Sequence, residues 1–426
     1  MLRAITLSKT SQMRQFRFRS FLTQRKFSTA NAPSTNLSEL VLEQNRRKLG
    51  YWFLGTGALV AGMVVVGGIT RLTRSGLSMT SWKLQGSLPP TSKEEWEKEF
   101  ERYKTFPEWQ QRQSMTLEEF KFIYFWEYSH RMMGRMIGFA FVLPGVYFGI
   151  RGMIPKALYP RVFLLFGLGG GQGLIGWWMV RSGLDTNIVD PNQKKEIRVS
   201  PYRLATHLVM AFTTYTLLIK TGLNQLYPHE SLMKMTSNLT SEVVQFARKS
   251  RKFAMHNAAL AAVTVLTGAY VAGNDAGRAY NTFPKMGDDW LPPKEDLFPL
   301  QPLWRNFVET TGLVQFDHRV MAISTASAIT LMYAQARRAL QGQYWQQIPK
   351  TLRFGYNASM GMVLVQVGLG ISTLLMYVPT ELAAAHQAGA IVLLTMLTGL
   401  VHTLGFSKYG KKLANPVVVQ KVAGLV

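Results

Sequence analysis

The sequence predicts an all-α polytopic membrane protein with eight transmembrane helices, arranged as two tandem, pseudo-symmetric four-helix bundles. Three observations predict this fold. Eight runs are long enough to cross a hydrocarbon layer, which takes about 20 predominantly apolar residues. Histidines recur inside four of these runs, and the segments that follow the first and fifth runs resemble each other. The eight runs cover 49–70, 121–150, 160–180, 202–222, 253–273, 312–335, 352–377 and 382–405.

Residues 1–30 are predicted to be a mitochondrial targeting segment and not part of the fold. They hold seven basic residues among Ser, Thr and Phe, and the first acidic residue of the chain is Glu39. An acid-free N-terminus rich in Arg and Ser is typical of such segments, and removal near Phe27 would suit the sequence. The alternative is a disordered basic tail on a bacterial protein. Residues 31–48 are predicted to be a polar lead-in.

Charges in the loops predict the orientation. The segments on one side of an eight-span arrangement are basic and carry almost no acid near the spans. By the positive-inside rule that side is the matrix of an inner mitochondrial membrane, so both termini are expected there. The predicted order is an N-terminal bundle at 49–222, a basic matrix linker at 223–252, a C-terminal bundle at 253–406 and a matrix tail at 407–426. We expect membrane lipid around these bundles and no nucleic-acid partner.

Four histidines are predicted to be metal ligands: His130, His207, His318 and His386. Each lies about five to ten residues inside the outer entry of its run, which is roughly 8–15 Å deep at a rise of about 1.5 Å per residue. Two neutral imidazoles from different helices can ligate a haem iron on its two faces, so four suggest two haems. With no cysteine in the chain, thiolate-bound metals and iron–sulfur clusters are excluded.

An internal repeat relates the two halves. Gln172 to Gly176 in the third run match Gln366 to Gly370 in the seventh, His130 corresponds to His318, and His207 corresponds to His386. Because each half has four spans, both halves keep the same orientation and the repeat is parallel. The other three histidines do not share this depth and are predicted to be interfacial or hydrogen-bonded; they are His229, His256 and His402.

Charged neighbours distinguish the two halves. Arg131 and Arg319 directly follow their histidines, and either they bind haem propionates or they extend to the nearby membrane interface. Glu127 lies three residues before His130 on the same helix face, whereas Gln315 holds the matching place in the second half. A carboxylate beside only one site suggests that one site reacts and the other passes electrons. The alternative for Glu127 is an ion pair with Arg131.

Residues 45–406 resemble the mitochondrial haem A synthase family. The resemblance is carried by EYSHR at 127–131, QFDHR at 315–319, the two further histidines and GNDAGRAYNTFPKMGDDWLPP at 273–293. It implies that a ring methyl of haem O is oxidised, through successive hydroxylations, to the formyl group of haem A for cytochrome c oxidase. It also implies that His130 and His207 flank this substrate haem, that Glu127 assists at the methyl, and that His318 and His386 hold a permanent haem B.

The resemblance also implies partners. We expect a ferredoxin-type electron donor and contacts with haem O synthase and with cytochrome c oxidase assembly factors. The chain has no cysteine and so lacks the pairs that some bacterial relatives carry in outer loops. Glycine on dense apolar helix faces makes a homo-oligomer a possible state.

Two other classes of protein stay open. One is a bis-histidine membrane electron carrier of the cytochrome b type, and the other is a non-catalytic oxidase assembly factor. A carrier that moves electrons across the bilayer needs haems near both surfaces, but these ligands are all predicted near one. A scaffold would need neither four ligands nor a carboxylate at membrane depth.

Overall fold

The computed structural model describes residues 37–79, 81–83, 85–184, 197–235 and 239–408, and their regular structure is helical apart from one isolated β-bridge between Met286 and Asp289. The predicted targeting segment at 1–30 lies outside the described residues, as does the predicted matrix tail from residue 409 onward. The remaining residues from 43 onward cluster as one compact unit.

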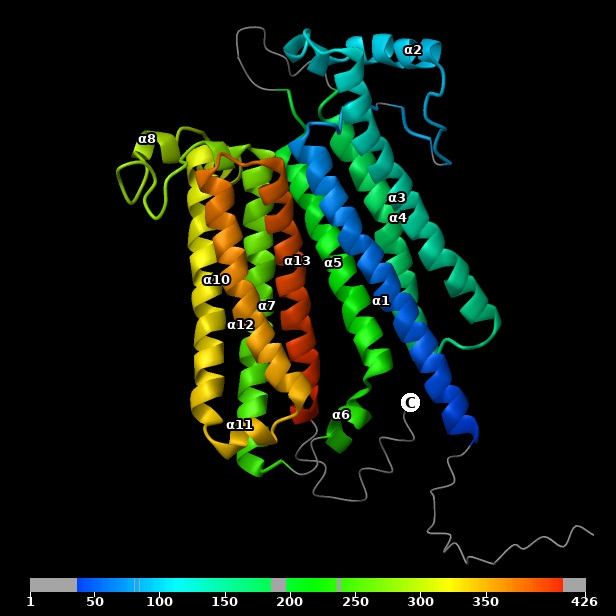
Figure 1. Ribbon diagram of the computed structural model, residues 1–426, viewed down its shortest axis with the longest axis vertical. Coiled ribbons are helices and arrows are strands. Elements are labelled where there is room, and N and C mark those ends of the chain that lie inside the picture. Colours follow the sequence, from blue (N-terminus) through cyan, green and yellow to red (C-terminus); the bar gives the residue numbers. More distant parts are fainter. Residues whose placement is uncertain (1–36, 80, 84, 185–196, 236–238, 409–426) are drawn as a thin grey trace, which may run out of the picture. The chain divides into compact units, whose positions relative to one another are not determined.

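Eight long helices coincide with the eight predicted runs (Figure 1). They are α1 (Leu37–Leu72), α3 (Leu117–Ile150), α4 (Tyr159–Arg181), α5 (Pro201–Leu226), α7 (Ser241–Gly273), α10 (Thr311–Ala339), α12 (Lys350–Leu375) and α13 (Thr380–Thr403). Six of them, α1, α3, α4, α7, α12 and α13, are long and apolar enough to cross a membrane. The chain is therefore an all-helical, polytopic membrane protein.

The other two long helices, α5 and α10, are not among the six candidate spans. Their lengths of 26 and 29 residues would suffice for a crossing. Their sequences, however, include histidine and several threonines, and α10 also carries Gln315, Asp317 and Arg319. Polar side chains lower the mean hydropathy of both helices, and some of them lie where the sequence predicts a functional site.

Short helices connect the long ones. They are α2 (Lys93–Lys104), η1 (Pro107–Gln111), η2 (Lys156–Leu158), α6 (His229–Met235), η4 (Ala276–Arg278), α8 (Lys294–Leu297), η5 (Leu303–Arg305), α9 (Asn306–Glu309), α11 (Gln343–Gln347) and η6 (Leu404–Lys408). Two segments that the sequence predicted to be connections are partly helical in the structure. Part of the lead-in belongs to α1, and the predicted linker 223–252 holds α6 together with the ends of α5 and α7.

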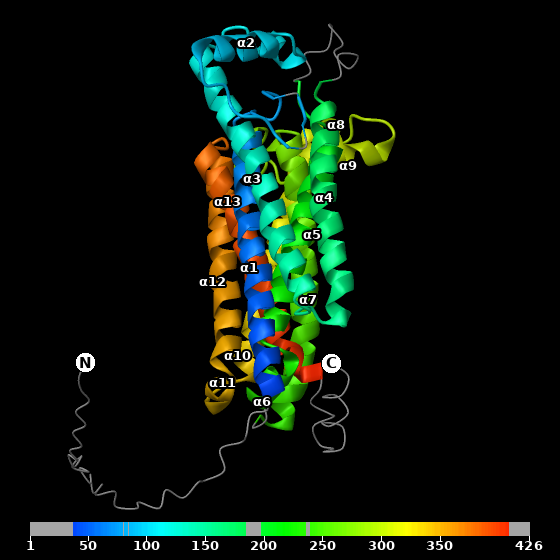
Figure 2. The ribbon, with the colours of Figure 1, turned by 90° about the vertical axis from the view of Figure 1, so that its right-hand side faces the viewer.

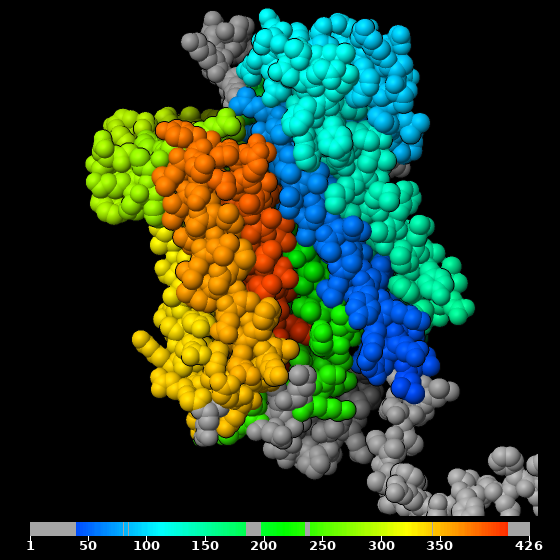
Figure 3. Space-filling view, viewed as in Figure 1, coloured from blue at the N-terminus to red at the C-terminus, as the bar shows by residue number. Residues whose placement is uncertain are grey.

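The described helices bury two large apolar clusters, one for each half of the sequence. Residues of α1, α3, α4 and α5 form the first, together with Ile391 and Leu394 of α13. The second lies among α7, α10, α12 and α13. Helix α13 contacts both α5 and α7, so the halves pack directly against each other. In Figures 2 and 3, α13 lies beside both α12 and α1.

A small cap covers the end of the bundle at which α3 begins (Figure 1). We call this the outer end; α5, α10 and α13 also begin there, and α1, α4, α7 and α12 end there. Thr116 and Glu119 form a capping box that starts α3, and α2 packs on this first part of α3 through buried aromatic side chains. Beneath them, Tyr103 donates a hydrogen bond to the buried Glu108 carboxylate at 3.1 Å, and burial raises the pKa of Glu108.

Candidate functional site

Each of the four predicted ligand histidines packs against a glycine of the preceding long helix. A Cβ atom built on that glycine would lie closer to the Cε1 atom of the imidazole than side chains ordinarily pack, so the absence of a side chain allows the observed approach. The distances from this Cβ position to Cε1 are 2.9 Å for Gly67 and His130, 3.3 Å for Gly176 and His207, 3.0 Å for Gly268 and His318, and 2.9 Å for Gly370 and His386.

All four contacts lie at the same place along their helices. Each glycine is five residues before the last residue of its helix at the outer end, in α1, α4, α7 and α12 alike. Five residues correspond to about 8 Å of helix. The structure therefore repeats one local arrangement four times, with every imidazole held at the same distance from an outer helix end.

The structure also brings the histidines together within each half. His130 lies within electrostatic range of His207, and His318 lies within electrostatic range of His386. The two members of a pair come from different helices, as ligands on the two faces of one flat macrocycle must. All four imidazoles are only partly buried, although they lie on membrane-type helices.

A glutamine supports the second histidine of each pair. Gln172 of α4 donates to the backbone carbonyl of His207 at 3.2 Å. Gln366 of α12 donates to the carbonyl of His386 at 2.9 Å, and its amide nitrogen is also 3.1 Å from His386 Nδ1. The glutamines match in the sequence repeat, so the repeat extends to side-chain contacts.

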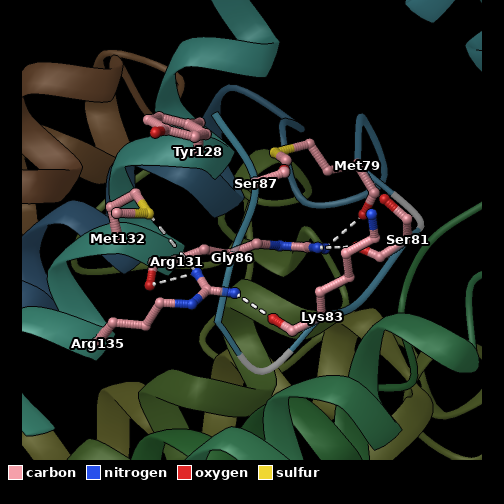
Figure 4. Close-up of a pocket in the computed structure, with 9 residues that line it drawn as sticks. All are labelled: Met79, Ser81, Lys83, Gly86, Ser87, Tyr128, Arg131, Met132 and Arg135. Carbon is pink, nitrogen blue, oxygen red and sulfur yellow. Dashed lines mark hydrogen bonds between the residues drawn. The ribbon is translucent and has the colours of Figure 1, made fainter. Parts of the chain in front are cut away.

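Arg131 forms the ion pair that the sequence left as an alternative for Glu127. Arg131 Nε donates to Glu127 Oε1 at 2.5 Å, and the carboxylate is buried. The same guanidinium donates to the carbonyl of Ser81 at 2.8 Å and to that of Met79 (Figure 4). Arg131 therefore fastens the loop that follows α1 to the outer part of α3.

Arg319 makes the matching contacts in the second half. It donates to the carbonyls of Tyr280 at 2.7 Å and Lys285 at 3.0 Å, and to Gln315 Oε1 at 3.1 Å. Gln315 thus takes the structural place of Glu127 without its charge. The two halves share this architecture and differ in the carboxylate.

A narrow cleft opens beside Arg131 (Figure 4). Arg135, one turn further along α3, also borders the cleft and donates to the carbonyl of Lys83 at 2.7 Å. The residues that line it are Met79, Ser81, Lys83, Gly86, Ser87, Tyr128, Arg131, Met132 and Arg135. This lining is cationic and contains no acidic side chain, which suits carboxylate groups.

A hydrogen bond between α13 and α1 links the two histidine pairs, because its residues lie next to His386 and Gly67. Gln387, next to His386, donates to the carbonyl of Val64 in α1 at 2.9 Å, and its side chain lies against Gly68. The neighbouring Gly67 carries the contact with His130. The two histidine pairs are therefore linked across the halves by a few directly packed groups.

His402 lies away from the two histidine pairs, at the other end of the bundle. His402 is hydrogen-bonded, as predicted: its Nδ1 is 3.1 Å from Asn224 Oδ1, and its Nε2 is 3.0 Å from the carbonyl of Tyr227. Its ring stacks on His229 with centroids 5.6 Å apart. Both nitrogens of His402 have partners, so this pair is part of the packing at the other end of the bundle.

The fold and the site define a polytopic helical membrane protein with two histidine pairs and a carboxylate beside one of them. Residues 50–398 match the model of the cytochrome oxidase assembly protein family, COX15-CtaA. Heme A synthase COX15 of Arabidopsis thaliana is 47% identical over 362 residues, which cover 85% of this chain and 75% of that protein. The Bos taurus Heme A synthase COX15 is 45% identical over 374 residues, 87% of this chain and 86% of that protein.

A third relative is the Heme A synthase-mitochondrial ferredoxin fusion protein of Schizosaccharomyces pombe. It is 41% identical over 378 residues, which cover 84% of this chain and 60% of that protein. Together these matches show that the chain belongs to the haem A synthase family, whose members are oxidoreductases.

The sequence analysis did not show which glycines contact the imidazoles. The repeat contained the signal, since Gly176 and Gly370 end its matched stretches, and Gly67 and Gly268 lie near the ends of the first and fifth runs. A glycine in an apolar run indicates only that helices pack closely there. Its position along one helix does not show which side chain of another helix it contacts.

Proposed function

We propose that this protein converts haem O into haem A for cytochrome oxidase by oxidising one ring methyl to a formyl group. The observation that carries the proposal is the fourfold glycine–histidine contact inside the region that matches the family. It supplies four imidazoles in two pairs at one depth, which is the ligand set for two haems.

The residues fit a flat, iron-containing macrocycle. The histidines of each pair come from different helices, glycines permit close packing next to them, and the helices around them are apolar. When bound, the haems supply the redox chemistry. The chain would supply the histidine nitrogens that bind the iron, the packing that positions the ring and the charged side chains near it. In the N-terminal half the cationic cleft at Arg131 and Arg135 would receive propionate carboxylates of the substrate.

The N-terminal half is proposed to hold haem O between His130 and His207, and the C-terminal half to hold haem B between His318 and His386. The difference between Glu127 and Gln315 supports this assignment. Oxidation of a methyl builds positive charge beside the ring, and the Glu127 carboxylate would stabilise that charge or accept the proton. Gln315 can do neither, so the C-terminal half would pass electrons. The hydrogen bond from Gln387 to the Val64 carbonyl of α1 would provide a short connection between the two haem sites.

We further propose that all eight long helices cross the membrane as two tandem four-helix bundles at 49–222 and 253–406. Two separate apolar clusters and the repeated glycine–histidine contacts support this division. The basic loops at the end opposite the cap support a matrix location for that end, and with it for both termini. The inner mitochondrial membrane is the proposed location, with residues 1–30 as the targeting segment and 223–252 as a matrix linker.

A ferredoxin-type protein is the proposed electron donor. The Schizosaccharomyces pombe relative is fused to a mitochondrial ferredoxin, which supports this choice. Haem O synthase and oxidase assembly factors are proposed as further partners, because the substrate is a hydrophobic haem that has to be delivered and its product passed on.

Extraction of pigments from the purified protein tests the proposed function. We expect haem B together with haem O and haem A. Haem B alone would identify a cytochrome b type carrier, and a protein free of haem after purification in mild detergent would point to an assembly factor without chemistry.

Substitution of the glycines tests the placement of haem B. Gly268→Ala and Gly370→Ala should lower bound haem B by roughly 10-fold or more, because the new methyl forces a ligand imidazole to move. Gly361→Ala and Gly368→Ala are matched controls, since no described atom outside the local helix lies within 4 Å of a Cβ at either position. The low-spin haem absorbance per protein measures the effect, and equal haem content in all four variants would contradict the placement.

A further inference from the structure

The two halves differ in how they hold the first histidine of each pair. Thr267 Oγ1 lies 2.9 Å from His318 Nδ1 in the C-terminal half. The matching residue in the N-terminal half is Val66, which, like Thr267, directly precedes the glycine that contacts the histidine. Valine has nearly the shape of threonine but cannot form a hydrogen bond.

The contacts of Thr267 determine which nitrogen of His318 carries the proton. The Thr267 hydroxyl donates its only hydrogen to the carbonyl of Thr264 at 2.9 Å, so its oxygen accepts from His318 Nδ1–H. This contact requires the proton on Nδ1, which leaves the lone pair of Nε2 for a metal.

His130 has no such support. Its Nδ1 is buried and has no hydrogen-bond partner among the described residues, and the same holds for His207 Nδ1. Both rings of the N-terminal pair are therefore positioned by packing alone, against Gly67 and Gly176.

We infer that Thr267 is a positioning residue that makes the C-terminal site a permanent haem site, and that Val66 leaves the N-terminal site free to exchange its haem. This inference rests on the proposed function. A hydrogen bond from Nδ1–H fixes the tautomer and orientation of a ligating histidine and makes it a stronger donor to iron. A stronger donor stabilises the ferric state and lowers the reduction potential. A substrate haem must leave after oxidation, which an unanchored imidazole permits.

Thr267→Val in the full-length protein tests this inference, with Thr267→Ser as the conservative variant. We expect Thr267→Val to raise the midpoint potential of the resident haem B and to speed its loss to an apomyoglobin acceptor by roughly 10- to 100-fold. Thr267→Ser should restore both values. Thr373→Val is the matched control, because the Thr373 hydroxyl donates to the Leu369 carbonyl of its own helix and not to a histidine.

The reciprocal variant, Val66→Thr, should slow the release of haem A or haem O from the other site. An unchanged potential and an unchanged rate of haem loss in Thr267→Val would overturn the inference and leave the ligand assignment standing. A low-spin haem B signal that persists in His318→Ala would overturn the ligand assignment and the inference with it.

Discussion

Glu127→Gln is expected to leave both haems bound and to reduce the conversion of haem O by roughly 100- to 10,000-fold, the usual contribution of a positioned acid or base. Haem O should accumulate, and haem A should be nearly absent from the extracted pigments. The reason is chemical: glutamine retains the shape of the side chain but can neither accept the proton nor balance developing positive charge.

The chain itself shows that glutamine fits at this position. In the C-terminal half, Gln315 accepts a hydrogen bond from Arg319 at 3.1 Å, and Arg319 still fastens its loop through backbone carbonyls. A glutamine at 127 can accept from Arg131 in the same way, so the variant removes the charge and keeps the architecture. Normal haem A in Glu127→Gln would reduce Glu127 to a structural partner of Arg131.

His318→Ala is expected to abolish the low-spin signal of haem B, whereas His130→Ala should retain it. In the proposed ligand set the iron has two bonds to the protein, so removal of one imidazole should empty the C-terminal site. The measurement is the reduced-minus-oxidised spectrum of each purified variant, normalised to protein. The opposite pattern, with haem B lost in His130→Ala and kept in His318→Ala, would reverse the assignment of the two halves.

The long helices could be predicted from sequence because apolar length alone determines which segments suit a membrane. All eight predicted runs coincide with long helices, and the differences lie in the connections. Residues 37–48 and much of 223–252 are helical although they are polar. Hydropathy reports burial in lipid and carries no information about a helix that continues into water.

The four histidines could be singled out from the sequence because an ionisable side chain in an apolar run is rare, and their role as haem ligands stays a prediction. The residues that position these histidines could not be predicted. The role of Gly67 depends on α1 facing α3, and the role of Thr267 depends on the distance from its hydroxyl to His318 Nδ1. The contacts of Arg131 with a loop some 50 residues away in sequence could not be inferred from spacing within one helix.

The central claim is that two haems lie at one depth near the outer end, each held by one histidine pair, with a carboxylate beside only one of them. A cryo-electron microscopy map of the purified, haem-loaded protein tests it most directly. We predict one iron between His130 and His207, a second between His318 and His386, and Glu127 beside the first ring. Irons near opposite membrane surfaces, or irons bound by any other side chains, would contradict the account.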